Sequence, residues 1–496
     1  MNIALALLSL PPLLVVVAAL LLVGTRLDYK RHQRLVFSKA KDTPVCIGVF
    51  HPYANGGGGG ERVLYGALIA LVEYFTRRTK KGSSDTEYAL QLILYTGDDG
   101  LTAPQLIHRA AIHFNLPELL EYRVDKFVTL VTLHGRDLLE PNRYPSFTLL
   151  WQAIAQFRLG LEAFAESRKR GIYPQFWLET LGCPFSYLVA RIGFGCTVMS
   201  YTHYPMISVD MIDRVQRRES SITNQAAITT SASRSRIKYV YYRLFAAVYG
   251  AVGRCCTTVS MVNSTWTHDH VKKLWGNAPI VVYPGCGSIQ DYMKFSLENR
   301  DLVAISISQF RPEKNHMLQL EAVKVLFDEH SDKMVSKFGE FKLVIIGSCP
   351  TKESEKLVAT LQAEARNLGV QDHVEFLVNA SYADMKPYME RASIGIHTMS
   401  NEHFGISNVE IMAAGIIHIA NDSAGPKYDI VKPGTGYLAS TAREYAARMW
   451  QVLNQSPAEL VKIRQAARES TRRFSDEHFK RNFIAAIEVG LRKKLG

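Results

Sequence analysis

VCIGVFHPYANGGGGGERVL, residues 45–64, combines a strand pattern, a glycine run and a helix start. The apolar run at 45–50 is typical of a buried strand. Leu64, Leu68 and Leu71 then recur at helical spacing. Between them stand five glycines at 56–60. Because glycine loses more conformational freedom on folding than any other residue, such a run needs a reason beyond a simple turn.

The glycine run is placed where a ligand can meet a helix N-terminus. Backbone N–H groups at a strand–helix junction face outward with the helix dipole behind them, and glycine lets a phosphate or sugar approach closely. The run lacks both the dinucleotide-binding and the P-loop patterns, so the kind of ligand stays open. We therefore predict a phosphate- or acceptor-binding loop at Gly57, Gly58, Gly59 and Gly60. A flexible connector is the weaker alternative, because the helix starts directly at Glu61.

Strand-like runs alternate with helical patterns along the rest of the chain. This alternation predicts parallel sheets built from βαβ units. A turn-rich stretch at 283–288 separates two such series, so we expect two Rossmann-like domains with a ligand cleft between them. The predicted strands are 45–50, 90–95, 176–180, 197–201, 302–308, 342–346, 374–378, 393–397 and 416–420, with helices near 318–327 and 353–368. The predicted domains are 43–285 and 286–475, followed by a basic C-terminal helix at 476–496.

The N-terminal segment predicts a membrane anchor. Residues 3–24 are apolar except for Ser9 and a Pro11-Pro12 pair, which is about the length that spans a bilayer. A basic stalk at 26–42 follows the anchor at 1–25, so the positive-inside rule places the remaining chain in the cytosol. A cleaved signal peptide is the alternative, but the segment has no charged residue before its apolar run.

Charge and cysteine content agree with a cytosolic body that meets anionic partners. The formal net charge is +12, which suits an anionic membrane or phosphorylated small molecules, and no basic run resembles a nucleic-acid arm. The seven cysteines are scattered without a C-x-x-C pair, so neither a disulfide framework nor a zinc site is expected. The sequons at Asn263, Asn379 and Asn454 should then stay unglycosylated.

Residues 234–252 leave two interpretations open. Arg234, Arg236, Lys238 and Arg243 are mixed with aromatic and aliphatic residues. Such a helix suits a membrane interface. An ordinary buried helix with a charged rim fits equally well.

The stretch SNEHFGISNVEIMAAG, residues 400–415, carries two carboxylates separated by seven residues, Glu402 and Glu410. Gly405 breaks the chain before a helical pattern, which places the N–H groups of Ile406, Ser407 and Asn408 at a helix N-terminus suited to an anion. We therefore expect the two carboxylates to reach hydroxyl groups on either side of a bound phosphate.

Two shorter motifs add charge and a titratable group. SQFRPEKNH, residues 308–316, follows a strand and carries Arg311 and Lys314, which can neutralise a departing diphosphate. His203 in SYTHYP ends a strand of the first domain. Taken alone, residues 308–316 are better explained as a solvated turn, whereas His203 fits a structural and a catalytic role equally well. No D-x-D motif occurs, so cationic side chains and N–H groups, rather than a metal ion, are expected to hold the diphosphate.

Together these motifs resemble the GT-B retaining glycosyltransferases of the family that holds sucrose synthase. The G-G-x-E-R loop, the Glu313-Lys314 pair and the E-x7-E block match in order over 43–470. The chain resembles the endoplasmic-reticulum α-1,2-mannosyltransferases of asparagine-linked glycosylation more closely still, in its N-terminal apolar segment and in the complete sequences of these motifs. The resemblance implies transfer of the fourth and fifth mannoses from GDP-mannose to a dolichol-diphosphate oligosaccharide. It also implies a cytosolic body at the endoplasmic-reticulum membrane, no cofactor, and other mannosyltransferases of the pathway as partners.

The resemblance also implies residue roles. Glu402 would contact the mannose hydroxyls, Glu410 the ribose, and Lys314 the diphosphate, while His203 would lie near the transferred sugar. The family usually has an arginine five positions before the lysine, where this chain has Gln309, so Arg311 is the candidate substitute. With no evident nucleophile, front-face attack with retention is expected. The alternatives are a related enzyme using a UDP-sugar and another lipid, and a non-catalytic anchored scaffold.

Overall fold

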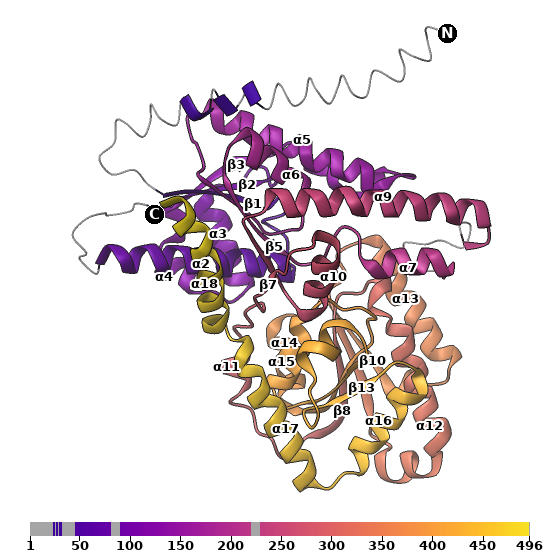
Figure 1. Cartoon of the computed structure of the whole chain (residues 1–496). Helices are drawn as coiled ribbons and strands as arrows, with labels where there is room; N and C mark the ends of the chain where they lie inside the picture. The colour runs from indigo at the N-terminus through magenta and orange to yellow at the C-terminus, as the bar shows by residue number, and fades with distance from the viewer. Residues whose placement is uncertain are drawn as a thin grey trace. The chain divides into compact units, whose positions relative to one another are not determined.

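The computed structural model describes residues 23–24, 26–27, 29–31, 45–80, 90–219 and 229–495, which form two compact units (Figure 1). Unit 1 takes the described residues up to Asn263, then Thr267–Val282 and those from Phe479 onward. Unit 2 takes Ser264–Trp266 and Tyr283–His478. Within the described ranges, no helix has the length and apolar character that crossing a bilayer requires. The predicted anchor lies almost entirely outside them.

Unit 1 is built on a seven-stranded parallel sheet with the strand order β3-β2-β1-β4-β5-β6-β7. The sequence predicted four of these strands, β1, β2, β4 and β5, and missed the other three. The strands are β1 (Val45–Phe50), β2 (Leu90–Thr96), β3 (Val128–Thr132), β4 (Phe176–Glu179), β5 (Thr197–Thr202), β6 (Val259–Val262) and β7 (Ile280–Val281). Sequence order reverses between β1 and β4, which makes their carboxyl ends the expected ligand position.

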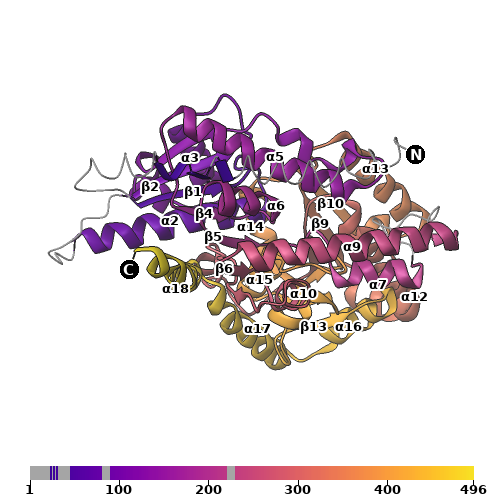
Figure 2. The same ribbon diagram turned by 45° about the horizontal axis from the view of Figure 1, so that its top comes forward.

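Helices cover both faces of this sheet because alternate strand residues point to opposite sides. On β1, Ile47 and Val49 enter one core, whereas Cys46 and Phe50 enter the other. The first core is covered by α2 (Gly59–Lys80), α3 (Ala103–His113), α4 (Glu118–Glu121) and α18 (Asp476–Leu495). The second is covered by α5 (Thr148–Lys169), α6 (Phe185–Leu188), α9 (Ala232–Cys256) and part of α10 (Thr265–Trp275). Helix α7 (Val209–Arg217) packs beside α9 (Figure 2).

The last helix returns to unit 1. Phe479, Phe483, Ile487 and Leu491 of α18 are buried in the same core as α2. The Lys480 ammonium lies 3.2 Å from the Glu73 carboxylate of α2. The C-terminal helix therefore belongs structurally to the N-terminal unit.

One side of helix α9 agrees with the buried-helix interpretation of residues 234–252, and the other side does not. Tyr242, Phe245 and Tyr249 are buried in the core of unit 1, as expected of a packed helix. Its opposite side exposes several aliphatic residues, which the buried-helix interpretation does not explain.

Unit 2 contains a six-stranded parallel sheet with the order β10-β9-β8-β11-β12-β13. Five of these strands agree with the predicted runs, and β13 was missed. They are β8 (Asp301–Ile307), β9 (Lys342–Gly347), β10 (Val374–Val378), β11 (Ala392–His397), β12 (Ile417–Asn421) and β13 (Tyr437–Ala439). One face is covered by α12 (His316–Phe338), α13 (Lys352–Asn367) and α16 (Ala442–Asn454). The other is covered by α11 (Ile289–Tyr292), α14 (Tyr382–Arg391), α15 (Ile406–Ala413) and α17 (Pro457–Thr471). Here the order reverses between β8 and β11.

All seven cysteines lie in the described ranges and are free thiols, as the sequence predicted. Six are buried and only Cys255, near the end of α9, is exposed.

Candidate active site

In unit 2, an ion pair forms where the strand order reverses. Lys314 ends a 3-10 turn after β8, and Glu402 follows β11, so the two neighbouring strands bring them together. The Lys314 ammonium lies 2.6 Å from Oε2 of Glu402. His397, the last residue of β11, places Nε2 3.2 Å from the same oxygen. Both contacts fall on Oε2, and within the described ranges Oε1 has no hydrogen-bond partner, which suits it to a ligand hydroxyl.

Glu402 stays ionised in this setting. Burial by itself would raise the pKa of its carboxyl group, but the hydrogen bond from His397 and the nearby Lys314 ammonium outweigh burial. The pKa therefore lies well below its ordinary value of 4.5. A fixed carboxylate can accept hydrogen bonds from sugar hydroxyls throughout the neutral range.

Backbone contacts hold this pair in place. The Thr398 hydroxyl, just before the Glu402 loop, lies 2.9 Å from the Lys314 carbonyl oxygen and 3.0 Å from that of Asn315. The Gln319 amide donates to the Thr398 hydroxyl at 2.9 Å, and the Tyr445 hydroxyl donates to the His397 carbonyl at 2.7 Å. The two loops are thus joined by hydrogen bonds besides the ion pair.

Gly405 turns the chain into α15 with a φ of 87°, in the left-handed region that favours glycine. A Cβ there would collide with the Asn408 side chain. The prediction of three available N–H groups was wrong for Asn408, whose N–H donates to the Gly405 carbonyl at 3.1 Å, because the first turn of the helix is tightened. Ile406 and Ser407 remain the candidate anion donors. Asn408 is instead buried, and its Oδ1 lies 3.0 Å from Nε2 of His418.

Glu410 lies one turn further along α15, as the spacing predicted. Its Oε1 accepts a hydrogen bond from the Ser288 hydroxyl at 2.5 Å. Ser288 comes from the turn-rich stretch that we interpreted only as a domain boundary. The serine therefore orients a predicted donor-binding carboxylate.

Arg311 does not join this cluster. Its side chain is 54% exposed, and its guanidinium lies 3.9 Å from the Glu313 carboxylate. Lys314, rather than Arg311, is the cation that contacts Glu402.

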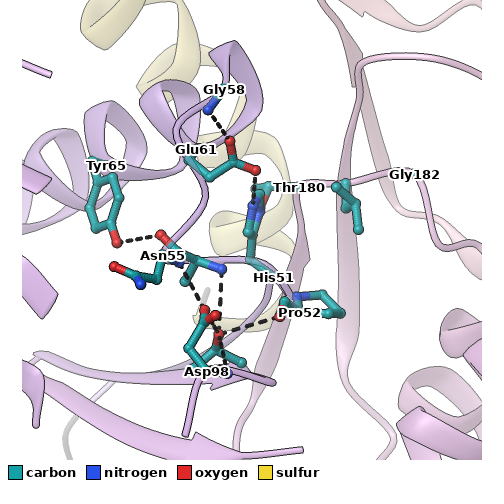
Figure 3. A network of polar contacts seen from close by, with 12 residues as sticks. His51, Pro52, Asn55, Gly58, Glu61, Tyr65, Asp98, Thr180 and Gly182 are labelled. Atoms are coloured by element: carbon teal, nitrogen blue, oxygen red, sulfur yellow. Dashed lines mark hydrogen bonds and ion pairs between the residues drawn. The ribbon is translucent and has the colours of Figure 1, made fainter. Parts of the chain in front are cut away.

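In unit 1, the glycine loop is packed against side chains (Figure 3). Glu61 folds back so that Oε2 accepts the Gly58 N–H at 2.7 Å, while Oε1 lies 3.3 Å from Nε2 of His51. A Cβ on Gly58 would lie 2.8 Å from Oε2 of Glu61, and one on Gly56 would lie 3.0 Å from its Cδ. The prediction of outward, unpaired N–H groups was thus wrong for Gly58, because the first acidic residue of α2 caps it.

The start of the loop is held by a second carboxylate. Asp98, after β2, accepts the Asn55 N–H at 2.8 Å and the Thr96 hydroxyl at 2.6 Å (Figure 3). Arg136 pairs with Asp98 at 2.7 Å. The Tyr65 hydroxyl donates to the Ala54 carbonyl at 2.7 Å. The loop between strand and helix is therefore fixed at both ends.

His203 and the end of the glycine loop come together in unit 1. His203 follows β5, and a Cβ on Gly60 would lie 3.7 Å from its Nε2. Gly57 faces His113, whose Nε2 would lie 3.0 Å from a Cβ there. Gly59 is the first residue of α2. The glycine loop thus leaves space for two imidazole rings and one carboxylate.

Sequence reasoning missed four polar residues of these sites: His397, Ser288, His51 and Asp98. His51 is fully buried after β1, and its Nδ1 lies 2.8 Å from the Thr180 hydroxyl after β4. His397 is the last residue of a strand, and His51 and Asp98 closely follow strands, so their position at strand carboxyl ends was the available signal. Ser288 had no such signal. Within the described ranges, no group of three or more His, Cys, Asp or Glu side chains is arranged to hold a metal ion.

Replacing Glu61 by alanine is expected to lower the free energy of unfolding of unit 1 by about 2 kcal/mol, because the Gly58 N–H and the buried His51 each lose a partner. Urea unfolding measures the loss. Glu61→Gln is the matched control, since its amide oxygen can still accept the Gly58 N–H, and it should lose less. Equal losses in both variants would show that the capping hydrogen bond contributes little.

Acid is expected to destabilise unit 2 through His316, the first residue of α12. Burial and the nearby Lys314 ammonium lower the pKa of this imidazole from 6.5 to about 4. Between those values the unfolded chain binds a proton that the folded chain does not. The free energy of unfolding therefore falls as the pH falls through this window, by about 3 kcal/mol in total. Urea unfolding across this range should show a shallower pH dependence for His316→Gln, and an unchanged slope would contradict the assignment.

Known protein families match both parts of the chain. Residues 44–275 match the family model for the ALG11 mannosyltransferase N-terminus, and residues 289–472 match glycosyl transferases group 1. The chain is 39% identical over 486 residues to the GDP-Man:Man(3)GlcNAc(2)-PP-Dol alpha-1,2-mannosyltransferase of Homo sapiens, covering 96% of this chain and 93% of that protein. It is 34% identical to the protein of the same name from Dictyostelium discoideum, covering 93% and 88%.

Solved structures share the fold at much lower identity. HepE of Anabaena in complex with UDP-glucose is 14% identical with a TM-score of 0.57, covering 89% of this chain and 99% of that chain. The α,α-trehalose 6-phosphate synthase of Burkholderia multivorans is 11% identical with a TM-score of 0.59, covering 91% and 99%. With the group 1 match, these confirm the predicted GT-B fold of two Rossmann-like domains. Its identity to the mannosyltransferases over nearly its whole length shows that the chain belongs to the ALG11 family of glycosyltransferases.

Proposed function

We propose that this enzyme transfers mannose from GDP-mannose, in α-1,2 linkage, to the dolichol-diphosphate-linked trimannosyl-chitobiose precursor of N-glycans. The reaction adds the fourth and fifth mannoses with retention of configuration. Family membership supports the activity, since the relatives are named as GDP-Man:Man(3)GlcNAc(2)-PP-Dol α-1,2-mannosyltransferases. The observation in this chain that carries the proposal is the Lys314–Glu402–His397 cluster at the strand-order reversal of unit 2.

The donor binds to unit 2 in this proposal. The Lys314 ammonium contacts the diphosphate, and the N–H groups of Ile406 and Ser407 at the start of α15 add further donors. Oε1 of Glu402 accepts a hydrogen bond from a mannose hydroxyl. Glu410, oriented by Ser288, accepts hydrogen bonds from the ribose hydroxyls.

Retention follows from attack on the face from which the diphosphate leaves. The acceptor hydroxyl forms the new bond to the anomeric carbon while the bond to the diphosphate oxygen breaks, and that oxygen takes the acceptor proton. The protein orients both substrates and stabilises the negative charge on the leaving group through Lys314. His203 and the glycine loop of unit 1 contact the sugar or the phosphates. No cofactor is needed in this scheme, because cationic side chains and N–H groups bind the diphosphate.

We place the enzyme at the endoplasmic-reticulum membrane, anchored by residues 1–25 with its body in the cytosol. The dolichol-linked acceptor is held in the same membrane, and other mannosyltransferases of the pathway are the proposed partners. The apolar segment and the basic stalk after it support this orientation.

Mass spectrometry of the protein from eukaryotic cells should find no glycan at Asn379 or Asn454. Both side chains are exposed and would accept a glycan in the lumen. Asn263 is the internal control, because it is buried and accepts a hydrogen bond from the Thr267 hydroxyl at 2.8 Å, so it should be bare in either orientation. A glycan on either exposed asparagine would reverse the proposed topology.

Transfer from labelled GDP-mannose to a synthetic trimannosyl-chitobiosyl lipid diphosphate tests the function. Two successive additions are expected, and an α-1,2-mannosidase should remove both. Transfer from a UDP-sugar to phosphatidylinositol, without transfer from GDP-mannose, would contradict the donor and acceptor. Rescue of cells lacking the enzyme by a Glu402→Ala, Glu410→Ala variant would indicate a scaffold instead.

A further inference from the structure

Helix α9 exposes a continuous apolar stripe on the side facing away from the core of unit 1. Ile237, Val240, Leu244 and Val248 are 65%, 50%, 65% and 54% exposed. Their spacing of three or four residues places them on one side of the helix. Isolated exposed aliphatic residues need no explanation, but four in one row mark an interaction surface.

Helix α5 exposes a second stripe on the same layer of unit 1. Leu150, Trp151, Ile154 and Leu161 are all exposed, and Phe147 precedes them at the helix N-cap. Trp151, Ile154 and Leu161 fall on one side of the helix, because the steps between them are three and seven residues. Both helices cover the same face of the sheet (Figure 1).

Direct contacts join the two stripes. The Phe147 ring lies edge-on to that of Tyr241 on α9, with centroids 5.3 Å apart. The Leu150 N–H donates to the Tyr241 hydroxyl at 2.9 Å. The exposed residues of α5 and α9 therefore form one surface, which we call the α5–α9 face: Phe147, Leu150, Trp151, Ile154, Leu161, Ile237, Val240, Leu244 and Val248.

The chain just after the predicted anchor is fixed to the same layer. Tyr29 is buried, donates its hydroxyl to the Pro174 carbonyl at 2.9 Å, and packs on Phe164 of α5 with ring centroids 5.6 Å apart. Val23 and Leu27, one turn apart, are 48% and 65% exposed. The described residues that follow the predicted anchor thus pack, through Tyr29, on the layer of unit 1 that carries the α5–α9 face.

Charge distinguishes this surface from an ordinary protein interface. Helix α9 contains no Asp or Glu in its 25 residues. Arg236 and Arg243, seven residues apart, are both exposed along one edge of its stripe, and Arg158 lies within the stripe of α5. An apolar stripe bordered by arginines suits the boundary between lipid headgroups and acyl chains.

We propose that the α5–α9 face binds the surface of a bilayer containing anionic lipids, with its apolar residues among the upper acyl chains and the arginines at the phosphates. This contact is additional to the anchor at 1–25. It would hold unit 1 at the surface in which the lipid-linked acceptor lies. Lipid binding is measured without catalysis, so the proposal can fail while the proposed function stands.

Trp151 provides a native probe in the full-length protein. Of the five tryptophans, Trp177, Trp266 and Trp275 are buried, while Trp151 is 47% exposed on the proposed face. The protein is reconstituted in phosphatidylcholine–phosphatidylinositol vesicles whose acyl chains are brominated near the headgroup. Bromine should quench a component of the fluorescence that is absent in Trp151→Phe. No Trp151-dependent quenching would overturn the proposal.

Charged substitutions on exposed positions test the surface without disturbing the core. Ile154→Glu with Leu244→Glu should abolish the Trp151-dependent quenching, while circular dichroism and the melting temperature stay unchanged. Ile112→Glu is the matched control, because Ile112 is 69% exposed on α3, which covers the opposite face of the sheet. Undiminished quenching in the double variant, or an equal loss in Ile112→Glu, would contradict the assignment.

The arginines and the competing occupant are tested separately. Arg236→Gln with Arg243→Gln should weaken binding to phosphatidylinositol-containing vesicles by roughly tenfold, as followed by the Trp151 signal. The reason is that each cation contributes to binding an anionic surface. A second copy of the chain is the alternative occupant. Lipid-free, concentration-dependent crosslinking through the exposed Cys255, with Trp151 protected from aqueous iodide, would show that the face joins two copies and would overturn lipid binding.

Discussion

Lys314→Ala is expected to lower the turnover number by about 10²-fold or more, while the protein remains folded. Negative charge grows on the diphosphate as it leaves, so the lysine contributes most in the transition state and its loss falls on kcat rather than KM. The ammonium already lies within 2.6 Å of Glu402, at the position where the proposed donor binds. Initial rates at saturating GDP-mannose measure the effect.

Arg311→Ala is the matched control for Lys314→Ala. It removes a cation from the same loop, but this side chain is half exposed and pairs only loosely with Glu313. Its turnover should stay within a few-fold of the native rate. A large loss in Arg311→Ala, with little change in Lys314→Ala, would move the diphosphate contact to the arginine.

Glu402→Gln is expected to reduce kcat by about 10²-fold, although the glutamine side chain has nearly the same shape as glutamate. The amide cannot carry the charge that the Lys314 ammonium and His397 stabilise in the native protein. It also gives the mannose hydroxyls a weaker acceptor, since hydrogen bonds to charged groups are the stronger ones. Steady-state rates with the lipid-linked acceptor measure the effect.

Glu410→Gln distinguishes the role of Glu410 from that of Glu402. The amide can keep the hydrogen bond from Ser288, so the loop should hold its position. A weakened contact with the ribose, which does not react, should raise the KM for GDP-mannose by about tenfold and leave kcat nearly unchanged. The assigned roles would be contradicted if Glu410→Gln lowered kcat and Glu402→Gln raised only KM.

The sequence predicted the strands that carry the sites because those strands are buried on both faces. Apolar runs such as 45–50 and 393–397 remain visible without knowledge of the neighbours. Of the missed strands, β3, β7 and β13 lie at the sheet edges and are only partly buried, whereas β6 lies inside the sheet but has only four residues. Their short or mixed patterns resemble loops.

Side-chain partnerships were less predictable than strands. The Glu402 motif and Lys314 were recognised from their positions after strands, but their ion pair depends on β8 and β11 being neighbours, which no local pattern specifies. Ser288 acts through Glu410, 122 residues away in the sequence, and His397 acts through Glu402, whose contact depends on how the loop between them folds. Only three-dimensional packing assigns them.

The glycine run shows how a correct location can come with an incomplete reason. Its place after β1 was predicted, as was its use of glycine to permit close approach. What approaches Gly56 and Gly58, however, is the carboxylate of Glu61 in the first turn of α2. Capping by a residue three positions later is a common feature of helix starts, and it was the available signal.

Helix α18 has a consequence for biosynthesis. A ribosome delivers the strands of unit 1 first, then residues 283–478 of unit 2, and only afterwards the four apolar side chains of α18 that complete the first core. Until then, the surface of α2 that they cover stays open to water. The N-terminal unit is therefore the last to finish folding. A nascent chain that stops before Phe479 should bind chaperones through the uncovered apolar surface of α2, which was synthesised hundreds of residues earlier.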